Sequence, residues 1–217
     1  MRNFIISPEG LPYIFTGIII TGLTALFSPY LSLGPLVFTL FTIYFFRNPQ
    51  RKIEINNKNI LSPADGKILS IEKLVYDDIL QCQAYKISIF LSIFNVHVNR
   101  VPVSGTIFYK KYIPGKFFPA FKSHASAYNE KNIVGINYGH LNLLVIQITG
   151  FIARRIVDWI KIGEYLPQGN TFGLIKFGSC TELVIPADQV SIHVTVGDKV
   201  KGGKTIIGVI TNETRSS

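Results

Sequence analysis

Residues 62–71 read SPADGKILSI and residues 84–94 read AYKISIFLSIF, and these two stretches decide the fold class. The first begins with the turn-forming residues Pro, Asp and Gly and then runs into a β-branched segment, while the second is rich in Ile and Phe. Similar apolar runs recur at 141–148 and 182–185, and turn signals such as VPVSG at 101–105 separate them. Regularly spaced short strands of this kind predict a mostly β domain.

A second stretch, VGDKVKGGKTII at 196–207, repeats the plan of residues 62–71, with an acidic residue and glycine before a β-branched strand. Both resemble the halves of a biotinyl/lipoyl-type barrel-sandwich hybrid. We therefore expect a mostly β (α+β) fold with a barrel-sandwich-hybrid-like domain. Residues 150–162, GFIARRIVDWIKI, have apolar side chains near helical spacing and predict a helix, although their β-branched content also permits a strand.

The N-terminal part differs in composition from the rest of the chain, because residues 11–46 contain no charged side chain. A membrane-spanning helix needs about 20 apolar residues, and Pro29, Gly34 and Pro35 interrupt this run. Two helices, 11–28 and 36–46, with a tight bend between them fit this pattern. We expect residues 1–52 to form an apolar, membrane-associated helical hairpin that either spans the bilayer or lies in one leaflet. A buried hairpin in a soluble core is the alternative.

Basic residues flank the hairpin on both sides, with Arg2 before it and Arg47, Arg51 and Lys52 after it. The positive-inside rule then puts both ends in the cytoplasm. Residues 53–217 are expected to form a separate β-rich domain, and the cytoplasmic face of a membrane is the expected location.

The composition limits the class of partner and of site. A net charge of +9 suits an anionic partner, but the basic residues are scattered without an arginine-rich run, which favours a membrane surface over nucleic acid. Cys82 and Cys180, with no close spacing, provide neither a zinc site nor a disulfide framework, and no metal-ligand spacing appears. We expect a reducing compartment and no metal.

Residues 173–185, GLIKFGSCTELVI, carry the candidate reactive site. On its own the Gly178-Ser179 pair is an ordinary turn dipeptide. The rest of the chain gives it a context, because the sequence resembles the short bacterial form of phosphatidylserine decarboxylase over essentially its whole length. The matching pieces, in family order and at family spacing, are YFFRNP (44–49), SPADG (62–66), SIFLSIFNVHVNRVP (88–102), YIPGKFF (112–118), AYNEKN (127–132), ARRIV (153–157) and IKFGS (175–179).

The resemblance implies a self-cleaving proenzyme, or zymogen, that is cut between Gly178 and Ser179. Ser179 Oγ would attack the Gly178 carbonyl and form an ester, and elimination would leave a dehydroalanine that hydrolyses to a covalent pyruvoyl cofactor. The products would be a large chain, 1–178, and a small pyruvoyl chain, 179–217, held together as a heterodimer. Glycine at 178 suits the attack, because the absence of a Cβ leaves its carbonyl unhindered.

The serine needs a base, and His97 in NVHVNR is the candidate. Asp65 of SPADG is the expected orienting partner in a Ser/His/Asp arrangement, although Asp65 also suits a turn role. The resemblance further implies that the pyruvoyl carbonyl forms a Schiff base with the amine of phosphatidylserine. Carbon dioxide then leaves, His97 returns a proton, and phosphatidylethanolamine is released.

Arg154 and Arg155 stand in an apolar stretch and are candidate ligands of the lipid phosphate, with a solvated or ion-paired face as an equal alternative. Cys180 departs from the family, which more often has threonine, serine or arginine there. The chain also has one histidine where some members have two, so His97 would serve both cleavage and decarboxylation.

Three other functions stay open at this point. The chain could be a non-catalytic, membrane-tethered carrier or binding module, although no tip-lysine motif stands out among Lys199, Lys201 and Lys204. It could be a degenerate decarboxylase that no longer processes, or an enzyme acting on another serine-headed lipid. The expected partners are phosphatidylserine and membrane lipid, without nucleic acid, and a higher oligomer is compatible with the sequence.

Overall fold

The computed structural model describes residues 4–119, 125–151, 155–176 and 179–211. The chain divides into two compact units, the first ending at Gln50 and the second beginning at Arg51. Each unit has its own secondary structure, helical in the first and mostly β in the second, as the sequence predicts.

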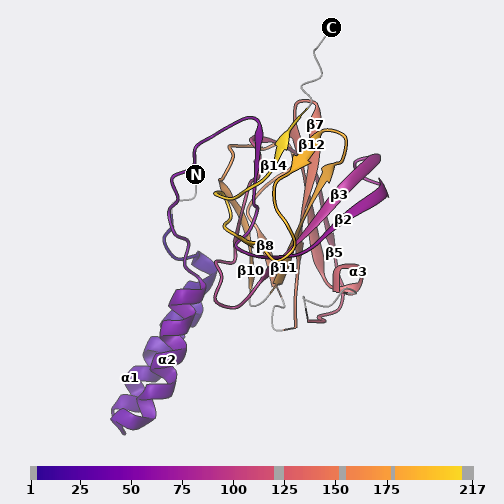
Figure 1. The fold of residues 1–217 in the computed structure, drawn as a ribbon. Coiled ribbons are helices and arrows are strands. Elements are labelled where there is room, and N and C mark those ends of the chain that lie inside the picture. The colour runs from indigo at the N-terminus through magenta and orange to yellow at the C-terminus, as the bar shows by residue number, and fades with distance from the viewer. Residues whose placement is uncertain (1–3, 120–124, 152–154, 177–178, 212–217) are drawn as a thin grey trace. The chain divides into compact units, whose positions relative to one another are not determined.

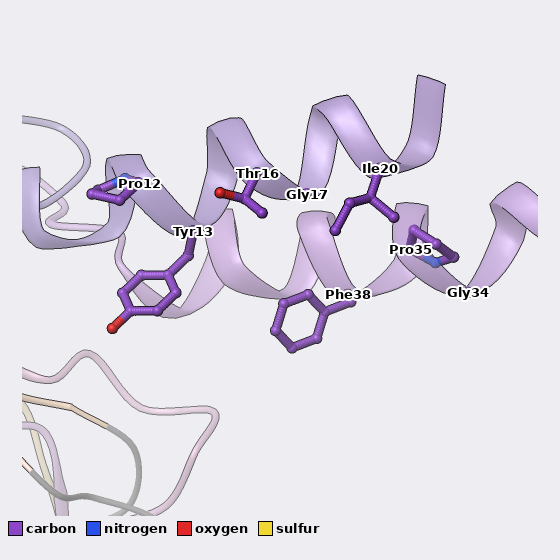
Figure 2. Close-up of a pocket in the computed structure, with 8 residues that line it drawn as sticks. All are labelled: Pro12, Tyr13, Thr16, Gly17, Ile20, Gly34, Pro35 and Phe38. Carbon is purple, nitrogen blue, oxygen red and sulfur yellow. The ribbon is translucent and has the colours of Figure 1, made fainter. Parts of the chain in front are cut away.

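The first unit is a pair of helices that follow a short 3₁₀ turn, η1 (Pro8–Gly10) (Figure 1). Helix α1 is Leu11–Ala25 and helix α2 is Pro29–Phe45. The helices approach closely at Gly17, because a Cβ there would lie 2.3 Å from Thr39 Oγ1. A groove of about 470 Å³ runs between them (Figure 2) and is lined by Pro12, Tyr13, Thr16, Gly17, Ile20, Gly34, Pro35 and Phe38.

The second helix begins earlier than the sequence predicts. The bend lies at residues 26–28, and Pro29 is the first residue of α2, where a missing N–H is tolerated because that group has no intrahelical partner. Pro35 lies inside α2, so the prediction that it belongs to the hairpin bend is wrong. Among the described residues, no helix is both long and apolar enough to cross a membrane.

The second unit contains three sheets whose neighbouring strands are all antiparallel. The largest has eight strands in the order β13-β2-β3-β11-β7-β6-β5-β9, and two three-stranded sheets have the orders β4-β10-β8 and β1-β14-β12. The strands are β1 (Asn59–Leu61), β2 (Gly66–Asp77), β3 (Cys82–Leu91), β4 (Val98–Arg100), β5 (Gly105–Ile113), β6 (Lys131–Tyr138), β7 (Leu141–Ile148), β8 (Arg155–Asp158), β9 (Tyr165–Leu166), β10 (Thr171–Lys176), β11 (Ser179–Pro186), β12 (Val190–Ile192), β13 (Lys199–Val200) and β14 (Ile206–Ile210), and a short helix, α3, is Ala125–Tyr128.

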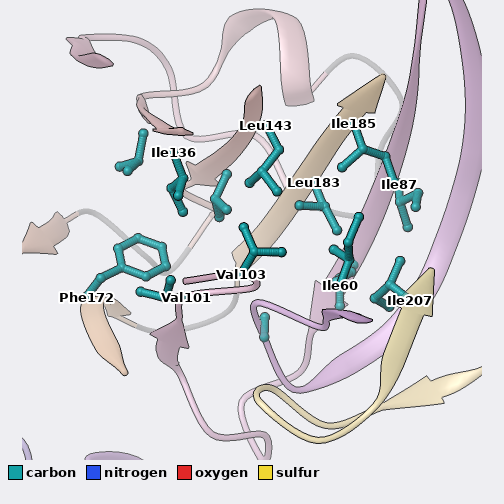
Figure 3. Packing of buried hydrophobic residues seen from close by; sticks show 14 of the residues in the cluster. Ile60, Ile87, Val101, Val103, Ile136, Leu143, Phe172, Leu183, Ile185 and Ile207 are labelled. Atoms are coloured by element: carbon teal, nitrogen blue, oxygen red, sulfur yellow. The ribbon is translucent and has the colours of Figure 1, made fainter. Parts of the chain in front are cut away.

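The hydrophobic core draws side chains from all three sheets (Figure 3). Strand β11 contributes Leu183 and Ile185, β1 contributes Ile60 and β10 contributes Phe172, and all four are fully buried. Because side chains alternate along a strand, Ser179 lies on the same face of β11 as Leu183 and Ile185. Ser179, the candidate reactive residue, is therefore the first residue of a strand whose inner face packs into the core.

Most strand predictions are confirmed, and one helix prediction is wrong. Residues 141–148 form β7 as predicted, and the two stretches that resemble each other, 62–71 and 196–207, pair directly through Lys67 and Lys199 of β2 and β13. The helix expected over 150–162 is contradicted by β8, which pairs with β10. The β-branched residues Ile156 and Val157 fit that pairing, and tertiary pairing overrides the weak helical spacing.

Candidate active site

The described strands on either side of the predicted cleavage site belong to different sheets. Strand β10 ends at Lys176 in a three-stranded sheet, and β11 begins at Ser179 in the eight-stranded sheet. Gly178 lies outside the described residues.

Ser179 is fully buried at the start of β11, opposite Leu91 of β3. Its Oγ has no hydrogen-bond partner among the described residues. A buried hydroxyl of this kind is not tied to a structural acceptor, and leaving it so costs about 1–3 kcal/mol. A serine whose hydroxyl takes part in chemistry fits this environment better than a purely structural one does.

His97 is fully buried just before β4, and its surroundings fix its tautomer. Its Nδ1 lies 3.0 Å from the backbone carbonyl oxygen of Asn95. A carbonyl oxygen can only accept, so Nδ1 carries the hydrogen and Nε2 carries the lone pair. The Asn95 side chain in turn accepts from the Ser92 backbone N–H at 2.9 Å and from Ser92 Oγ at 2.7 Å, which holds the turn that presents this carbonyl.

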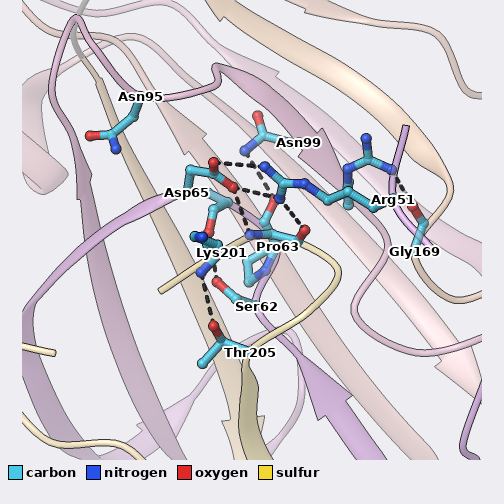
Figure 4. A network of polar contacts seen from close by, with 12 residues as sticks. Arg51, Ser62, Pro63, Asp65, Asn95, Asn99, Gly169, Lys201 and Thr205 are labelled. Atoms are coloured by element: carbon cyan, nitrogen blue, oxygen red, sulfur yellow. Dashed lines mark hydrogen bonds and ion pairs between the residues drawn. The ribbon is translucent and has the colours of Figure 1, made fainter. Parts of the chain in front are cut away.

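Asp65 is held by an arginine that the sequence does not single out for this role. Its two carboxylate oxygens accept from Nη1 and Nη2 of Arg51 at 2.7 and 2.8 Å, and Oδ1 also accepts from the backbone N–H of Gly202 at 2.8 Å (Figure 4). Nδ1 of His97 lies against the Asn95 carbonyl. A role for Asp65 toward His97 therefore stays a prediction.

Arg100, three residues after His97, is a second buried cation beside Asp65. Its Nη1 donates to the Gly169 carbonyl at 3.1 Å. Burial, with a smaller contribution from the positive charge of Arg51, lowers the pKa of Arg100 to about 10, and the Asp65 carboxylate opposes this shift. Arg100 is still protonated at neutral pH, so the Asp65 carboxylate interacts electrostatically with two guanidinium cations.

A chain of buried amides lies beneath the candidate site, and the sequence analysis does not identify it. Asn132 Nδ2 donates to Gln147 Oε1 at 3.0 Å, Gln147 Nε2 donates to Asn99 Oδ1 at 2.9 Å, and Asn99 Nδ2 donates to Thr181 Oγ1 at 3.0 Å. All four side chains are fully buried. We call this set the amide relay. A signal for it exists in hindsight, since Gln147 is the one amide near the end of the apolar run LNLLVIQI.

Cys180 faces away from Ser179, because adjacent residues of a strand point to opposite sides of the sheet. It packs with Ile148 and against Phe90. Burial raises the pKa of the Cys180 thiol strongly, and the nearby negative charge of Glu182 adds to the effect. The thiol is therefore neutral at physiological pH and is not a competing nucleophile.

Of the two arginines predicted to bind phosphate, the structure describes only Arg155. Arg154 lies outside the described residues. Arg155 is exposed at the start of β8 and is the direct partner of Lys176 in the β8–β10 pair. Residues directly opposite in an antiparallel pair share a face, so two cationic side chains lie together close to the end of β10.

Comparison with known proteins identifies the family of the chain. Residues 38–208 match the family profile described as phosphatidylserine decarboxylase. The chain is 50% identical over 202 residues to a phosphatidylserine decarboxylase proenzyme of Carboxydothermus hydrogenoformans, covering 93% of this chain and 95% of that protein. It is 44% identical over 194 residues to the proenzyme of Chlorobium phaeobacteroides (88% and 91% covered) and 40% identical over 212 residues to that of Symbiobacterium thermophilum (96% and 97% covered). The chain therefore belongs to the phosphatidylserine decarboxylase family.

Proposed function

We propose that this chain decarboxylates phosphatidylserine to phosphatidylethanolamine with a pyruvoyl group that it makes from its own Ser179. The observation that carries the proposal is the buried Ser179 hydroxyl, which has no hydrogen-bond partner among the described residues and stands at the junction of two sheets. Membership of a decarboxylase family supports the enzyme over the non-catalytic carrier.

The first step is an attack of Ser179 Oγ on the Gly178 carbonyl carbon. The new C–O bond forms, the C–N bond breaks, and the serine proton passes through the base to the leaving nitrogen, which gives an ester. Loss of the Cα proton and cleavage of the Cβ–Oγ bond then release the carboxylate of Gly178. Tautomerisation of the remaining enamine and addition of water release ammonia and leave the pyruvoyl group at the N-terminus of the chain 179–217.

His97 is the proposed base, acting through Nε2. The Asn95 carbonyl supports this role, because it keeps the hydrogen on Nδ1 and so places the lone pair on Nε2. After processing, the same nitrogen is the proposed donor of the proton that replaces carbon dioxide on the substrate. The pyruvoyl group, once formed, supplies an electron sink for the pair of electrons left by decarboxylation.

Asp65 is the proposed acidic member of the site. Its contacts support an electrostatic role, because its carboxylate balances Arg51 and lies near Arg100. Without it, the buried guanidinium groups of Arg51 and Arg100 would lose the carboxylate that compensates their charge. Asp65 would thus serve the site through these two arginines.

The lipid phosphate is proposed to bind at Arg155, with Arg154 as a second ligand. The pairing of Arg155 with Lys176 supports this, because it collects positive charge two residues before Gly178. An arginine guanidinium can bind a phosphate through two N–H groups at once.

Association with the cytoplasmic face of the bacterial inner membrane is proposed to run through the helical pair. Large apolar side chains at its bend are exposed, with Leu26, Phe27 and Tyr30 at 82%, 85% and 89%. We further propose that the β unit is a barrel-sandwich hybrid, for which the direct pairing of β2 with β13 is the supporting contact.

The test is processing of the purified protein on a denaturing gel. The wild type should give two fragments, 1–178 and 179–217, and Ser179→Ala should stay whole. Borohydride reduction of the mature protein should abolish release of carbon dioxide from phosphatidylserine vesicles, because it converts the pyruvoyl ketone to an alcohol. A wild-type chain that stays whole on prolonged incubation would overturn the proposal.

A further inference from the structure

The amide relay joins β4, which begins directly after the proposed base His97, to β11, which begins at the proposed nucleophile Ser179. Asn99 lies two residues after His97, and Thr181 lies two residues after Ser179. The hydrogen bond from Asn99 Nδ2 to Thr181 Oγ1, 3.0 Å long, is thus a tie between corresponding positions of two strands. Strands β4 and β11 belong to different sheets, so no backbone ladder between them sets their spacing.

The direction of every hydrogen bond in the relay is fixed by one carbonyl. Asn99 Nδ2 also faces the Pro63 backbone oxygen at 3.4 Å, and that oxygen can only accept. Asn99 must therefore turn its Oδ1 toward Gln147, which must donate, and Gln147 must turn its Oε1 toward Asn132. The Asn99 amide consequently has one orientation, in which its N–H groups point to Thr181 and Pro63.

The fold makes room for this arrangement. Thr181, Gln147 and Asn132 are direct neighbours on β11, β7 and β6, so they form one polar row across the inner face of the sheet. The row below it, Leu183, Val145 and Val134, is apolar core. Gly173 lies over the relay, where a Cβ would stand 2.8 Å from Gln147 Nε2. Burying three amides is costly unless they are hydrogen-bonded, and each of the three bonds within the relay.

We propose that Asn99 is a positioning residue that sets His97 against Ser179 through its bond to Thr181, with Gln147 and Asn132 fixing the orientation of the Asn99 amide. The inference rests on the proposed function, because it assigns the relay to the self-cleavage step. A displacement of about 1 Å between a base and its nucleophile can lower a rate by about 100-fold. Loss of the tie should therefore slow processing strongly while the reacting groups stay intact.

The experiment follows the cleavage rate of freshly made precursor in Thr181→Val, Thr181→Ser, Asn99→Ala and the double variant. Thr181→Val keeps the shape and removes the acceptor, and we expect cleavage about 10- to 100-fold slower. Thr181→Ser keeps the hydroxyl and should cleave like the wild type. The double variant should be no slower than Asn99→Ala alone, because both changes remove the same bond.

Comparison of Thr181→Val with Thr181→Ser separates positioning from simple loss of structure. Only the serine keeps the hydroxyl that accepts from Asn99 Nδ2. Recovery of the wild-type cleavage rate in Thr181→Ser alone supports positioning, and equal slowing of the two variants would overturn the proposal.

Gln168→Ala is the matched control. Gln168 is also a buried amide, and it donates to the Asn59 and Pro102 carbonyls at 2.7 and 2.9 Å, but it does not join β4 to β11. The folded fraction of this variant should cleave at the wild-type rate. If wild type cleaves and Thr181→Val cleaves equally fast, the positioning role is wrong while the proposed function stands. If the wild type itself fails to cleave, the proposed function fails first.

Discussion

Asn99 Nδ2 donates to Thr181 Oγ1 over 3.0 Å, and this bond joins a strand of the three-stranded sheet to the central strand that begins at Ser179. The two residues are 82 positions apart in the chain. The relationship links the segment of the proposed base, His97, which lies just before β4, to the strand of the proposed nucleophile, Ser179, across a buried polar row. Substitutions in and around that row should therefore affect folding and processing to different extents.

Gly173→Ala should disturb the relay without changing any polar group. The new Cβ would lie 2.8 Å from Gln147 Nε2 and 2.7 Å from the Val157 carbonyl oxygen, both too close for unstrained contact. We expect a loss of about 1–3 kcal/mol in the free energy of unfolding, together with slower processing. Urea unfolding of a Ser179→Ala background measures the first, and a gel time course in the native background measures the second.

Gly22→Ala is the control for that substitution. Gly22 is inside α1, and no heavy atom lies within 4 Å of the place that an alanine methyl group would take. Alanine there should stabilise the helix by about 0.5–1 kcal/mol and leave processing unchanged. Equal effects of the two glycine substitutions on processing would contradict the assignment of Gly173 to the relay.

Asp65→Asn should lower both stability and processing. The Arg51 and Asp65 side chains are only 9% and 13% exposed, so the change leaves a nearly buried guanidinium without its carboxylate, at a cost of about 3 kcal/mol. The double variant Asp65→Asn with Arg51→Met should regain part of the stability, measured by urea unfolding. Processing should stay slow in both, and full recovery in the double variant would argue that Asp65 serves the fold alone.

Much of the fold follows from the sequence because its signals are local. Residues 141–148 are an apolar run followed by a glycine turn, and they form β7 without an error at either end. The prediction that Pro35 interrupts the helices was wrong, because a proline within a helix removes one N–H and need not end the helix. The Asp65–Arg51 pair and the amide relay could not be predicted, since their members are brought together by sheet topology and each alone is an ordinary polar residue.

The two cysteines should differ in reactivity. Burial and nearby carboxylates raise the pKa of Cys82, but its side chain is partly exposed, whereas Cys180 is buried and its thiol pKa is raised much further. At pH 8 a thiol reagent should label Cys82 in the native protein and Cys180 only after denaturation. Cys180→Ala should process at close to the wild-type rate, and a large slowing would give Cys180 a role that its orientation does not suggest.

Replacing Leu26, Phe27 and Tyr30 by serine should weaken binding to phosphatidylserine vesicles. Burying a large apolar side chain contributes about 1.5–3 kcal/mol, so co-sedimentation affinity should fall by at least about 10-fold. Val75→Ser is the matched control, because Val75 is 83% exposed in β2 of the other unit. Unchanged vesicle binding by the triple variant would show that the bend of the helical pair does not enter the bilayer.

The most direct test of self-processing is the intact mass of the small chain of the purified wild-type protein under denaturing conditions. We predict a fragment of residues 179–217 that is lighter by one ammonia than the same peptide beginning with serine, and that is absent from Ser179→Ala. A fragment with the full serine mass would mean hydrolysis without a pyruvoyl group. A single uncut chain of 217 residues would contradict self-processing at Ser179 altogether.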